Sequence, residues 1–319
     1  GLMIVFIFGV FLTSFSNSYA MVLVARIITA AGDGPLISVA LAFAAKIASP
    51  AQKGKLVSWI FSGFSLASIF GVPIGTWIGS VAGWQMAFTA IGVVSVSVFL
   101  LLAKVLPREK VIRRKENSTK SVSVGNNYIL DKRVLIAIWI PVFNWAATFC
   151  VYTYFRPIFT SLLGFPKSMI MLLFFGYGTV AFASNQISGR LANGDYLHSL
   201  LKYFLLAGGV FFLFPILLSN QILGLLGIAI MGLTAYLINS PLQIYFIDIA
   251  QKDYPNQLVF ASSLNSITAT LGIAIGAFAG GIIVDWLGLG MLGPQAGIFM
   301  LITFGLTLIL HRVDRLSQS

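Results

Sequence analysis

The chain has 319 residues, of which 58% are hydrophobic and 9% are charged, and its mean hydropathy is +0.94. This composition excludes a soluble globular domain and predicts a protein that crosses a membrane several times. The net charge of +11 does not indicate nucleic-acid binding, because no basic fold with interleaved aromatic residues accompanies it. A single cysteine, Cys150, excludes a disulfide framework and a cysteine-rich metal site. We expect a lipid bilayer as partner, and no nucleic acid, metal or cofactor.

Ten apolar runs are long enough to cross a bilayer as helices. A polar segment separates the first four runs from the last six. We therefore expect an all-α polytopic membrane protein with an N-terminal bundle at 1–106, a cytoplasmic linker at 107–133 and a C-terminal six-helix bundle at 134–319. The runs cover about 1–19, 20–47, 54–80, 84–106, 134–160, 168–192, 199–219, 221–250, 257–284 and 294–312.

The second run contains two charges and a Gly-Asp-Gly-Pro sequence. Arg26 and Asp33 lie seven residues apart, hence on nearly the same helix face and about 10 Å apart along the axis. Asp33 is the only acid before Glu109, and Pro35 weakens the helix beside it. An ionisable residue at this depth indicates either a functional group or one half of a fixed internal ion pair. We predict that Asp33 carries a coupling proton and that Arg26 opposes or releases it.

The third and ninth runs carry small residues at every fourth position. Such a stripe lets another helix backbone approach closely, so we interpret it as a packing surface. Pro73 adds a kink or a flexible point to the third run. The stripes consist of Gly63, Ala67, Gly71, Gly75 and Gly79 in the third run and Gly272, Gly276 and Gly280 in the ninth.

The C-terminal runs contain uncharged polar and aromatic residues at membrane depth. Gly/Pro-interrupted spans at matching places in both halves indicate a binding site, and the candidates here are residues 32–35 and 239–241. Aromatic faces with a few hydrogen-bonding groups suit a small planar or amphipathic solute, although core filling and interhelical hydrogen bonds are alternatives for each residue. The predicted substrate cavity comprises Asn144, Trp145, Phe149, Asn239, Gln243 and Asn265.

Positive charges gather on one side of the membrane. Seventeen of the twenty lysine and arginine residues follow even-numbered runs or lie in the linker and the C-terminus. By the positive-inside rule these segments are cytoplasmic. We expect a multi-pass protein of the cell membrane with a cytoplasmic C-terminus.

The chain also repeats itself at an offset of about 200 residues. F70-G-V-P-I-G-T-W-I-G79 aligns with L271-G-I-A-I-G-A-F-A-G280, and I47-A…L56-V aligns with I249-A…L258-V. Runs one to four therefore match runs seven to ten. Counterparts of runs five and six would precede Gly1, so we expect two further N-terminal helices in a 6+6 architecture.

These stretches resemble the major facilitator superfamily, and within it the drug:proton antiporter branch and the bacterial arabinose, purine and nucleoside efflux group. R26-I-I-T-A-A-G-D-G is similar to the fourth-helix motif of that branch, and G63-F-S-L-A-S-I-F-G-V-P-I-G to its fifth-helix motif. S188-G-R-L-A-N193 is similar to the second cytoplasmic loop motif, which places Gly189, Arg190 and Asn193 there, with Asn193 where an acid is usual. The resemblance implies twelve helices in two pseudo-symmetric bundles, of which about ten are present, and alternating access around a central cavity.

Taken together, these features predict a secondary active transporter that exports a small organic solute or drug in exchange for protons. We expect it to be monomeric and not an enzyme. No catalytic cluster, phosphate-binding loop or paired intramembrane carboxylates occur in the sequence. A sugar or nucleobase uptake carrier of the same superfamily, and a membrane fragment that does not transport, are the alternatives.

Overall fold

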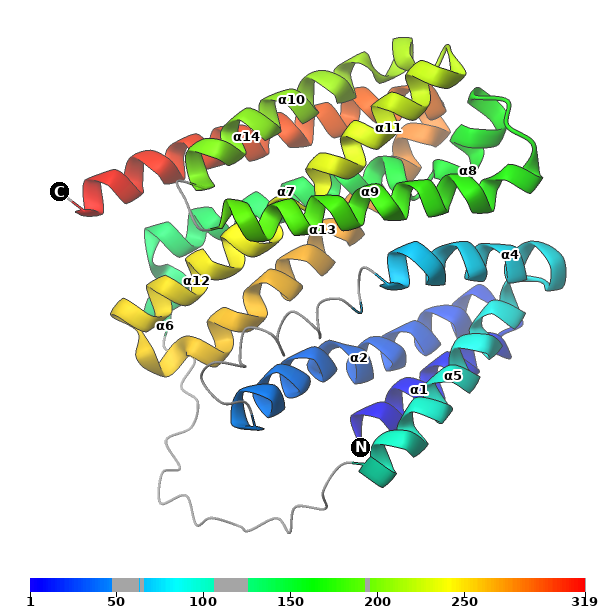
Figure 1. The fold of residues 1–319 in the computed structure, drawn as a ribbon, viewed down its shortest axis with the longest axis horizontal. Coiled ribbons are helices and arrows are strands. Elements are labelled where there is room, and N and C mark those ends of the chain that lie inside the picture. The colour runs from blue at the N-terminus through cyan, green and yellow to red at the C-terminus, as the bar shows by residue number, and fades with distance from the viewer. Residues whose placement is uncertain (48–62, 64–65, 106–125, 193–195, 319) are drawn as a thin grey trace. The chain divides into compact units, whose positions relative to one another are not determined.

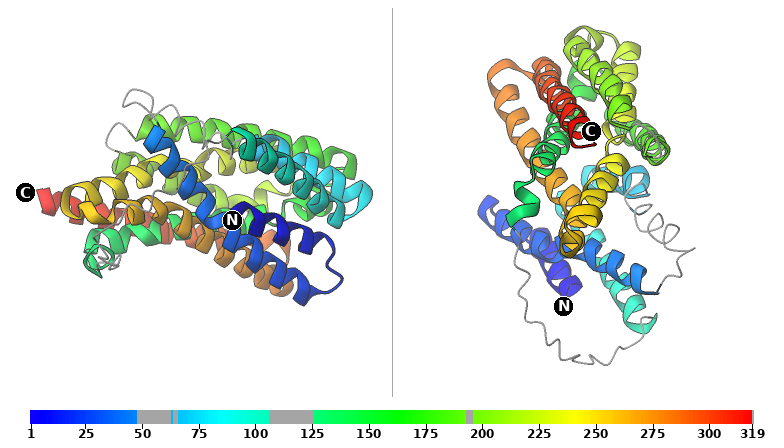
Figure 2. Two further views of the ribbon diagram at one scale, coloured as in Figure 1. Left: turned by 90° about the horizontal axis from the view of Figure 1, so that it is seen from below. Right: turned by 90° about the vertical axis from the view of Figure 1, so that its left-hand side faces the viewer.

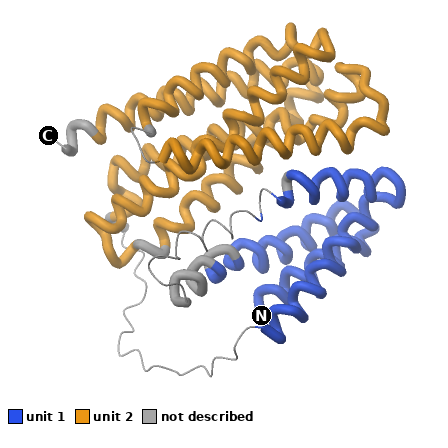
Figure 3. Tube along the Cα trace, in the orientation of Figure 1, with its two compact units in different colours: residues 1–123 blue, residues 124–319 orange. Residues whose placement is uncertain are grey.

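The computed structural model describes residues 1–47, 63, 66–105, 126–192 and 196–318. Every regular element in these ranges is helical, which confirms the all-α prediction (Figure 1). The chain divides into two compact units, residues Gly1–Ser123 and Val124–Ser319 (Figure 3).

The described residues of the first unit form helices α1, α2, α4 and α5 and one π-helical turn. Helix α1 packs against α2 and α5, and α4 packs against α5. Ser14 Oγ joins α1 to α5, lying 2.6 Å from Thr89 Oγ1 and donating to the Gln85 carbonyl at 3.1 Å. The elements are α1 (Leu2–Ser14), α2 (Tyr19–Ile47), the π-helical turn η1 (Ala67–Gly71), α4 (Val72–Ala82) and α5 (Trp84–Val105).

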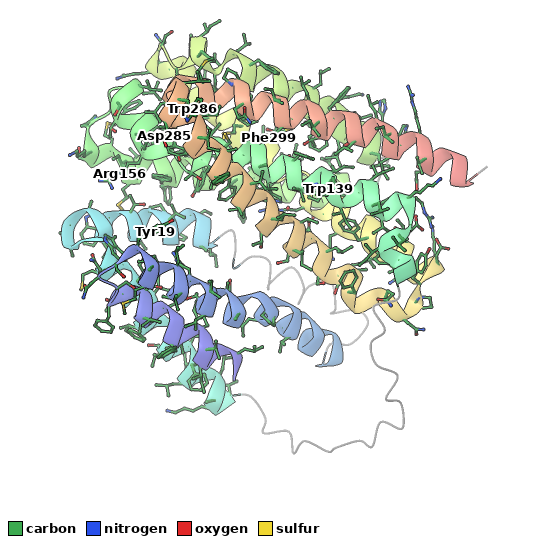
Figure 4. All side chains as sticks on the ribbon, turned by 180° about the vertical axis from the view of Figure 1, so that it is seen from behind. Tyr19, Trp139, Arg156, Asp285, Trp286 and Phe299 are labelled. Carbon is green, nitrogen blue, oxygen red and sulfur yellow. The ribbon has the colours of Figure 1, made fainter. Side chains whose placement is uncertain are left out.

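In the second unit, α7 is the central helix and packs along α13 and α14, while α10 pairs with α14 and α11 packs against α9 and α10 (Figures 1 and 2). Figure 4 labels Trp139 on α7 and Phe299 on α14. The Phe143 ring lies 6.0 Å from each of their rings, so aromatic contacts tie these two helices together. The longer helices are α7 (Lys132–Tyr152), α9 (Ile170–Leu191), α10 (Tyr196–Leu217), α11 (Gln221–Ala235), α12 (Asn239–Asp253), α13 (Leu258–Leu287) and α14 (Leu292–Gln318). The shorter elements are α6 (Asn126–Leu130), α8 (Phe155–Pro157), η2 (Ile158–Leu162), η3 (Lys167–Met169), η4 (Pro255–Gln257) and η5 (Leu289–Met291).

The lengths of the helices agree with a membrane protein. Among the described residues, eight helical segments are long and apolar enough to span a bilayer, and Leu2–Ser14 and Ile69–Ala82 are shorter apolar helices. Part of the third predicted run and most of the predicted linker lie outside the described residues. The end of the predicted linker contains α6 and the first turn of α7, which begins at Lys132.

Glycines bring α13 close to α7. A Cβ atom on Gly272 would meet the Val142 carbonyl, and one on Gly276 would meet the Ala146 carbonyl. A Cβ atom on Gly280 would lie 2.8 Å from the carbonyl oxygen at position 150. The small-residue stripe of the ninth run therefore forms a contact between two helix backbones, as small residues do in membrane bundles.

Candidate functional site

The second unit contains a broken helix in the middle of an apolar segment. The segment Gln221–Asp253 is long enough to span a bilayer, but its helix is interrupted at residues 236–238, between α11 and α12. Pro241 in the first turn of α12 has no N–H to donate back into this interruption. Irregular backbone at membrane depth needs partners from elsewhere in the protein, because lipid supplies none.

Helices α7 and α9 supply the first two of these partners. Asn144 Nδ2 donates to the Ala235 carbonyl at 3.0 Å. The Tyr236 N–H donates to Ser184 Oγ at 3.2 Å. Asn144 and Ser184 are both 0% exposed, so each of these hydrogen bonds is made by a buried side chain.

Ser188, one turn after Ser184 on α9, makes two further hydrogen bonds to the backbone of the break. Its hydroxyl donates to the Leu237 carbonyl at 2.9 Å and accepts from the Ser240 N–H at 3.0 Å. One buried side chain thus replaces two backbone hydrogen bonds that the break removes. The break is a built feature of the second unit and is held on two sides.

The predicted cavity residues of α7 lie beside this break. The Trp145 ring contacts the Tyr236 ring edge to face, with centroids 5.1 Å apart, and its other neighbour is Phe149, at 5.9 Å. Asn144 Oδ1 and Trp145 Nε1 are buried and have no hydrogen-bond partner in the part of the chain that the structure describes. Unpaired buried polar atoms are uncommon in proteins and call for an explanation.

The remaining predicted cavity residues belong to α12 and α13. Asn239 Nδ2 donates to Asn185 Oδ1 on α9 at 3.1 Å, and Gln243 Nε2 donates to the carbonyl of Ser262 on α13 at 3.2 Å. Asn265 Oδ1 is buried without a hydrogen-bond partner among the described residues. Asn239 and Gln243 therefore join neighbouring helices, which is the interhelical alternative weighed for amides in membranes.

In the first unit, Arg26 and Asp33 lie on α2 and both are exposed. The Arg26 guanidinium carbon lies 4.5 Å from the centroid of the Phe88 ring on α5, in a cation–π contact. The ion pairs found within the described ranges do not join Arg26 to Asp33. The static ion pair considered from the sequence is therefore not formed in this structure.

The expectation of an interrupted helix at Gly32–Pro35 is wrong. Helix α2 runs without a break from Tyr19 to Ile47, with Pro35 inside it. Gly32 has a different function: a Cβ atom there would lie 2.8 Å from Phe6 Cα, so the glycine allows α2 to approach α1. Gly34 has open space around it. Of the two matching candidates for a broken span, only the one in the second unit is broken.

Five of the six predicted motif residues of the first unit lie on one stretch of helix. Ala67 and Gly71 belong to η1, and Pro73, Gly75 and Gly79 to α4. Space within 4 Å of a Cβ on Gly63 or Gly75 is open. In the loop motif, Gly189 and Arg190 end α9 as exposed residues, and Asn193 lies outside the described residues.

A charged cluster holds the start of α7 to the end of α12. Arg133 Nη2 lies 2.8 Å from Asp131 Oδ2 and 2.6 Å from Asp253 Oδ2. Burial acts to raise the pKa of Asp131, but hydrogen bonds from the Arg133 side chain and N–H, and from Tyr254, outweigh it, so this pKa lies below its ordinary value. Asp131 also caps α7, because its Oδ1 accepts from the Arg133 N–H at 2.8 Å.

Side chains that could hold a metal ion do not gather in groups of three or more histidines, cysteines or acids anywhere in the described ranges.

Comparison with known proteins places the fold in a family. Residues 1–259 match the sequence profile of the Major Facilitator Superfamily. The uncharacterized MFS-type transporter YtbD of Bacillus subtilis is 28% identical over 317 residues, which cover 98% of this chain and 79% of that protein. The purine ribonucleoside efflux pump NepI of Escherichia coli K12 is 24% identical over 310 residues, covering 94% of this chain and 75% of that protein.

A solved structure shows the same fold. A bacterial homolog of the human lysosomal transporter Spinster, in an inward-facing and unoccupied conformation, matches 98% of this chain and 81% of its own with a TM-score of 0.67 and 12% identity. The chain belongs to the Major Facilitator Superfamily, whose members are membrane transporters of small molecules. The resemblance noted in the sequence motifs is thereby confirmed.

Of the side chains that support the break, the sequence analysis predicted Asn144 and missed Ser184 and Ser188. Ser184, Ser188 and Tyr236 were not among the predicted site residues. A polar run, S184-N-Q-I-S188, near the C-terminal end of an apolar span was the available signal. Serine hydroxyls usually bond to their own helix, so only the tertiary contact reveals that these two serve α11 and α12.

Proposed function

We propose that this protein is a secondary active transporter that exports a small organic solute by alternating access, in exchange for protons. The observation that carries the proposal is the break between α11 and α12, with Asn144, Ser184 and Ser188 holding its backbone. In membrane transporters, discontinuous helices of this kind form substrate sites. The efflux direction takes support from NepI, which is named a purine ribonucleoside efflux pump.

The solute contacts in this proposal come from the second unit. Asn144, Trp145, Phe149 and Asn265 present aromatic faces and unpaired polar atoms, whereas Asn239 and Gln243 keep the surrounding helices in register. We propose a cytoplasmic C-terminus in the cell membrane, because seventeen of the twenty basic residues fall on that side of the predicted spans.

Proton coupling is assigned to Asp33. It is the only acid before Glu109, it lies on a membrane-spanning helix, and it is not held in an ion pair with Arg26. A carboxylate at such a position is free to load and release a proton as its surroundings change. Arg26, seven residues away and in contact with the Phe88 ring, would then lower the affinity for the proton whenever it comes close to Asp33.

Asp33→Asn tests this assignment, because it keeps the shape of the side chain and removes its titration. In proteoliposomes containing the full chain, we expect the variant to lose solute flux driven by a pH gradient while exchange without a gradient persists. Asp285→Asn, at the exposed end of α13, is the matched control and should retain gradient-driven flux. Unchanged gradient-driven flux in Asp33→Asn would rule out the proton role.

A further inference from the structure

The broken helix lies against a continuous group of aromatic rings. Trp145, Phe149 and Tyr152 follow one another at helical spacing on α7, and the Phe149 and Tyr152 centroids are 5.1 Å apart. Tyr177 on α9 extends the group, with its ring 5.3 Å from that of Tyr152. Tyr236, at the break itself, closes the other end against Trp145.

Two glycines allow two of these aromatic side chains to lie against neighbouring helices. A Cβ atom on Gly232 of α11 would lie 2.8 Å from Tyr177 Cε2, and one on Gly272 of α13 would lie 2.8 Å from Trp145 Cβ. Each aromatic side chain therefore lies directly against the backbone of a neighbouring helix. Rings held in this way lose little further freedom when a solute binds to them, which favours affinity.

Three polar atoms in the group have no hydrogen-bond partner among the described residues. Asn144 Oδ1 is an acceptor, Trp145 Nε1 is a donor, and Tyr177 Oη is both. Asn144 is 0% exposed and the two aromatic residues are each 6% exposed. An unpaired buried polar group destabilises the folded protein, so a core built only for packing would not accumulate three of them beside one helix break.

The aromatic group and Asn144 contain no charged side chain. An anionic solute would find no countercharge among Asn144, Trp145, Tyr152, Tyr177 and Tyr236, and its desolvation would remain uncompensated. A flat neutral solute can place its faces on the rings and its edge on the unpaired donor and acceptors.

We infer that these five residues form a binding site for an uncharged, planar solute that carries both a hydrogen-bond donor and an acceptor on its edge. The inference rests on the proposed transport function, whose substrate class it specifies. It adds Tyr152, Tyr177 and Tyr236 to the site as residues that select the solute by shape and by lack of charge.

The test measures equilibrium binding of three matched probes to the purified full chain in detergent. Benzamide is planar and neutral with a donor and an acceptor, benzoate has the same shape with a negative charge, and cyclohexanecarboxamide has the same polar group on a puckered ring. We expect benzamide to bind at least about tenfold more tightly than either of the others, since each mismatch removes roughly 1.4 kcal/mol or more.

Variants locate the binding. Trp145→Phe and Tyr177→Phe keep a ring and remove one polar atom, so each should weaken benzamide binding by roughly two- to tenfold, the range for one hydrogen bond. Trp139→Phe is the matched control on the same helix, because Trp139 is 44% exposed and lies outside the group, and it should leave binding unchanged.

Equal binding of benzamide and benzoate, absence of benzamide binding, or wild-type affinity in both variants would overturn the inference. The binding measurement is independent of flux. Selective benzamide binding without gradient-driven transport would therefore support this site and contradict the proposed function, and proton-driven transport without this selectivity would do the reverse.

Discussion

The helical stretch formed by η1 and α4 carries glycine at three positions that match glycines of α13, and the two sets make different contacts. In α13, Gly272, Gly276 and Gly280 touch the backbone of α7. Their counterparts in the repeat are Gly71, Gly75 and Gly79. A Cβ atom on Gly71 would meet only the Ala67 side chain of the same helical stretch, and one on Gly75 would meet open space. A Cβ atom on Gly79 would lie 3.9 Å from Trp84 Cα, at the start of α5. No described residue of the first unit occupies the place that α7 takes in the second.

The second and eighth predicted runs, which match each other in the repeat, also differ in structure. Helix α2 is continuous through Gly32–Pro35, whereas its counterpart is divided into α11 and α12. The continuous helix has glycine against α1, and the divided one has Asn144, Ser184 and Ser188 to hold its free backbone groups. A motif of small or helix-breaking residues therefore permits close packing or an interruption of the helix. Which of the two occurs depends on the neighbouring helices.

The largest expected difference in stability is between variants of the two glycine stripes. Gly276→Ala places a methyl group against the Ala146 carbonyl, which should force α13 from α7 and lower the free energy of unfolding by about 1–3 kcal/mol. Gly75→Ala, the equivalent change in α4, enters open space and should stay within about 0.5 kcal/mol of wild type. Thermal unfolding of both purified variants measures the difference, and equal losses would show that the stripes are not used differently.

A second pair of variants tests whether the glycines of α2 serve packing or bending. Gly32→Ala would bring its Cβ to 2.8 Å from Phe6 Cα, and should destabilise the protein by about 1–3 kcal/mol. Gly34→Ala, two residues along, has space for the methyl group and should be neutral or slightly stabilising, because alanine favours helix over glycine. A hinge at this place would instead make the second variant the more harmful one for transport.

Ser188→Ala tests whether the broken helix depends on side chains of α9. It leaves the Leu237 carbonyl and the Ser240 N–H without their partner, at a cost of about 1–3 kcal/mol. Ser97→Ala is the control, because Ser97 is exposed on α5 and its hydroxyl donates to the Val93 carbonyl of its own helix. Similar thermal stability of the two variants would mean that the break does not depend on α9.

The smallest expected effect concerns the charged cluster at the start of α7. Because the pKa of Asp131 is lowered in the folded protein, its contribution to stability is complete above its unfolded pKa of about 4 and is lost as the pH falls through the lower, folded value. Asp131→Asn retains a capping side chain without the charge, so it should cost up to about 1 kcal/mol at neutral pH. The difference from wild type in thermal unfolding should shrink as the pH falls below about 4 and disappear once the pH is below the folded pKa of Asp131. A difference that stays constant with pH would contradict the role of the charge.

Several features were determined by the sequence alone. Apolar runs of bilayer length predicted the helices, because lipid cannot satisfy backbone polar groups and only complete helices cross it. The motifs around Arg26, Gly63 and Gly189 indicated the family, and a repeat offset of about 200 residues related the halves of the chain. These signals are local or periodic, so they survive without knowledge of neighbouring helices.

The positions of the helix breaks and of the glycine contacts depend on the neighbouring helices and could not be predicted from the sequence. The sequence predicted interruptions at both Gly32–Pro35 and Asn239–Pro241. A helix accommodates proline when its neighbours satisfy the freed carbonyl, and α2 is continuous. The other helix is divided, and side chains such as Ser188 bond to its free backbone groups. The unpaired Asn144, Trp145 and Tyr177 atoms likewise follow from the packing of α7, α9 and α11, because burial of a polar atom depends on residues far away in the sequence.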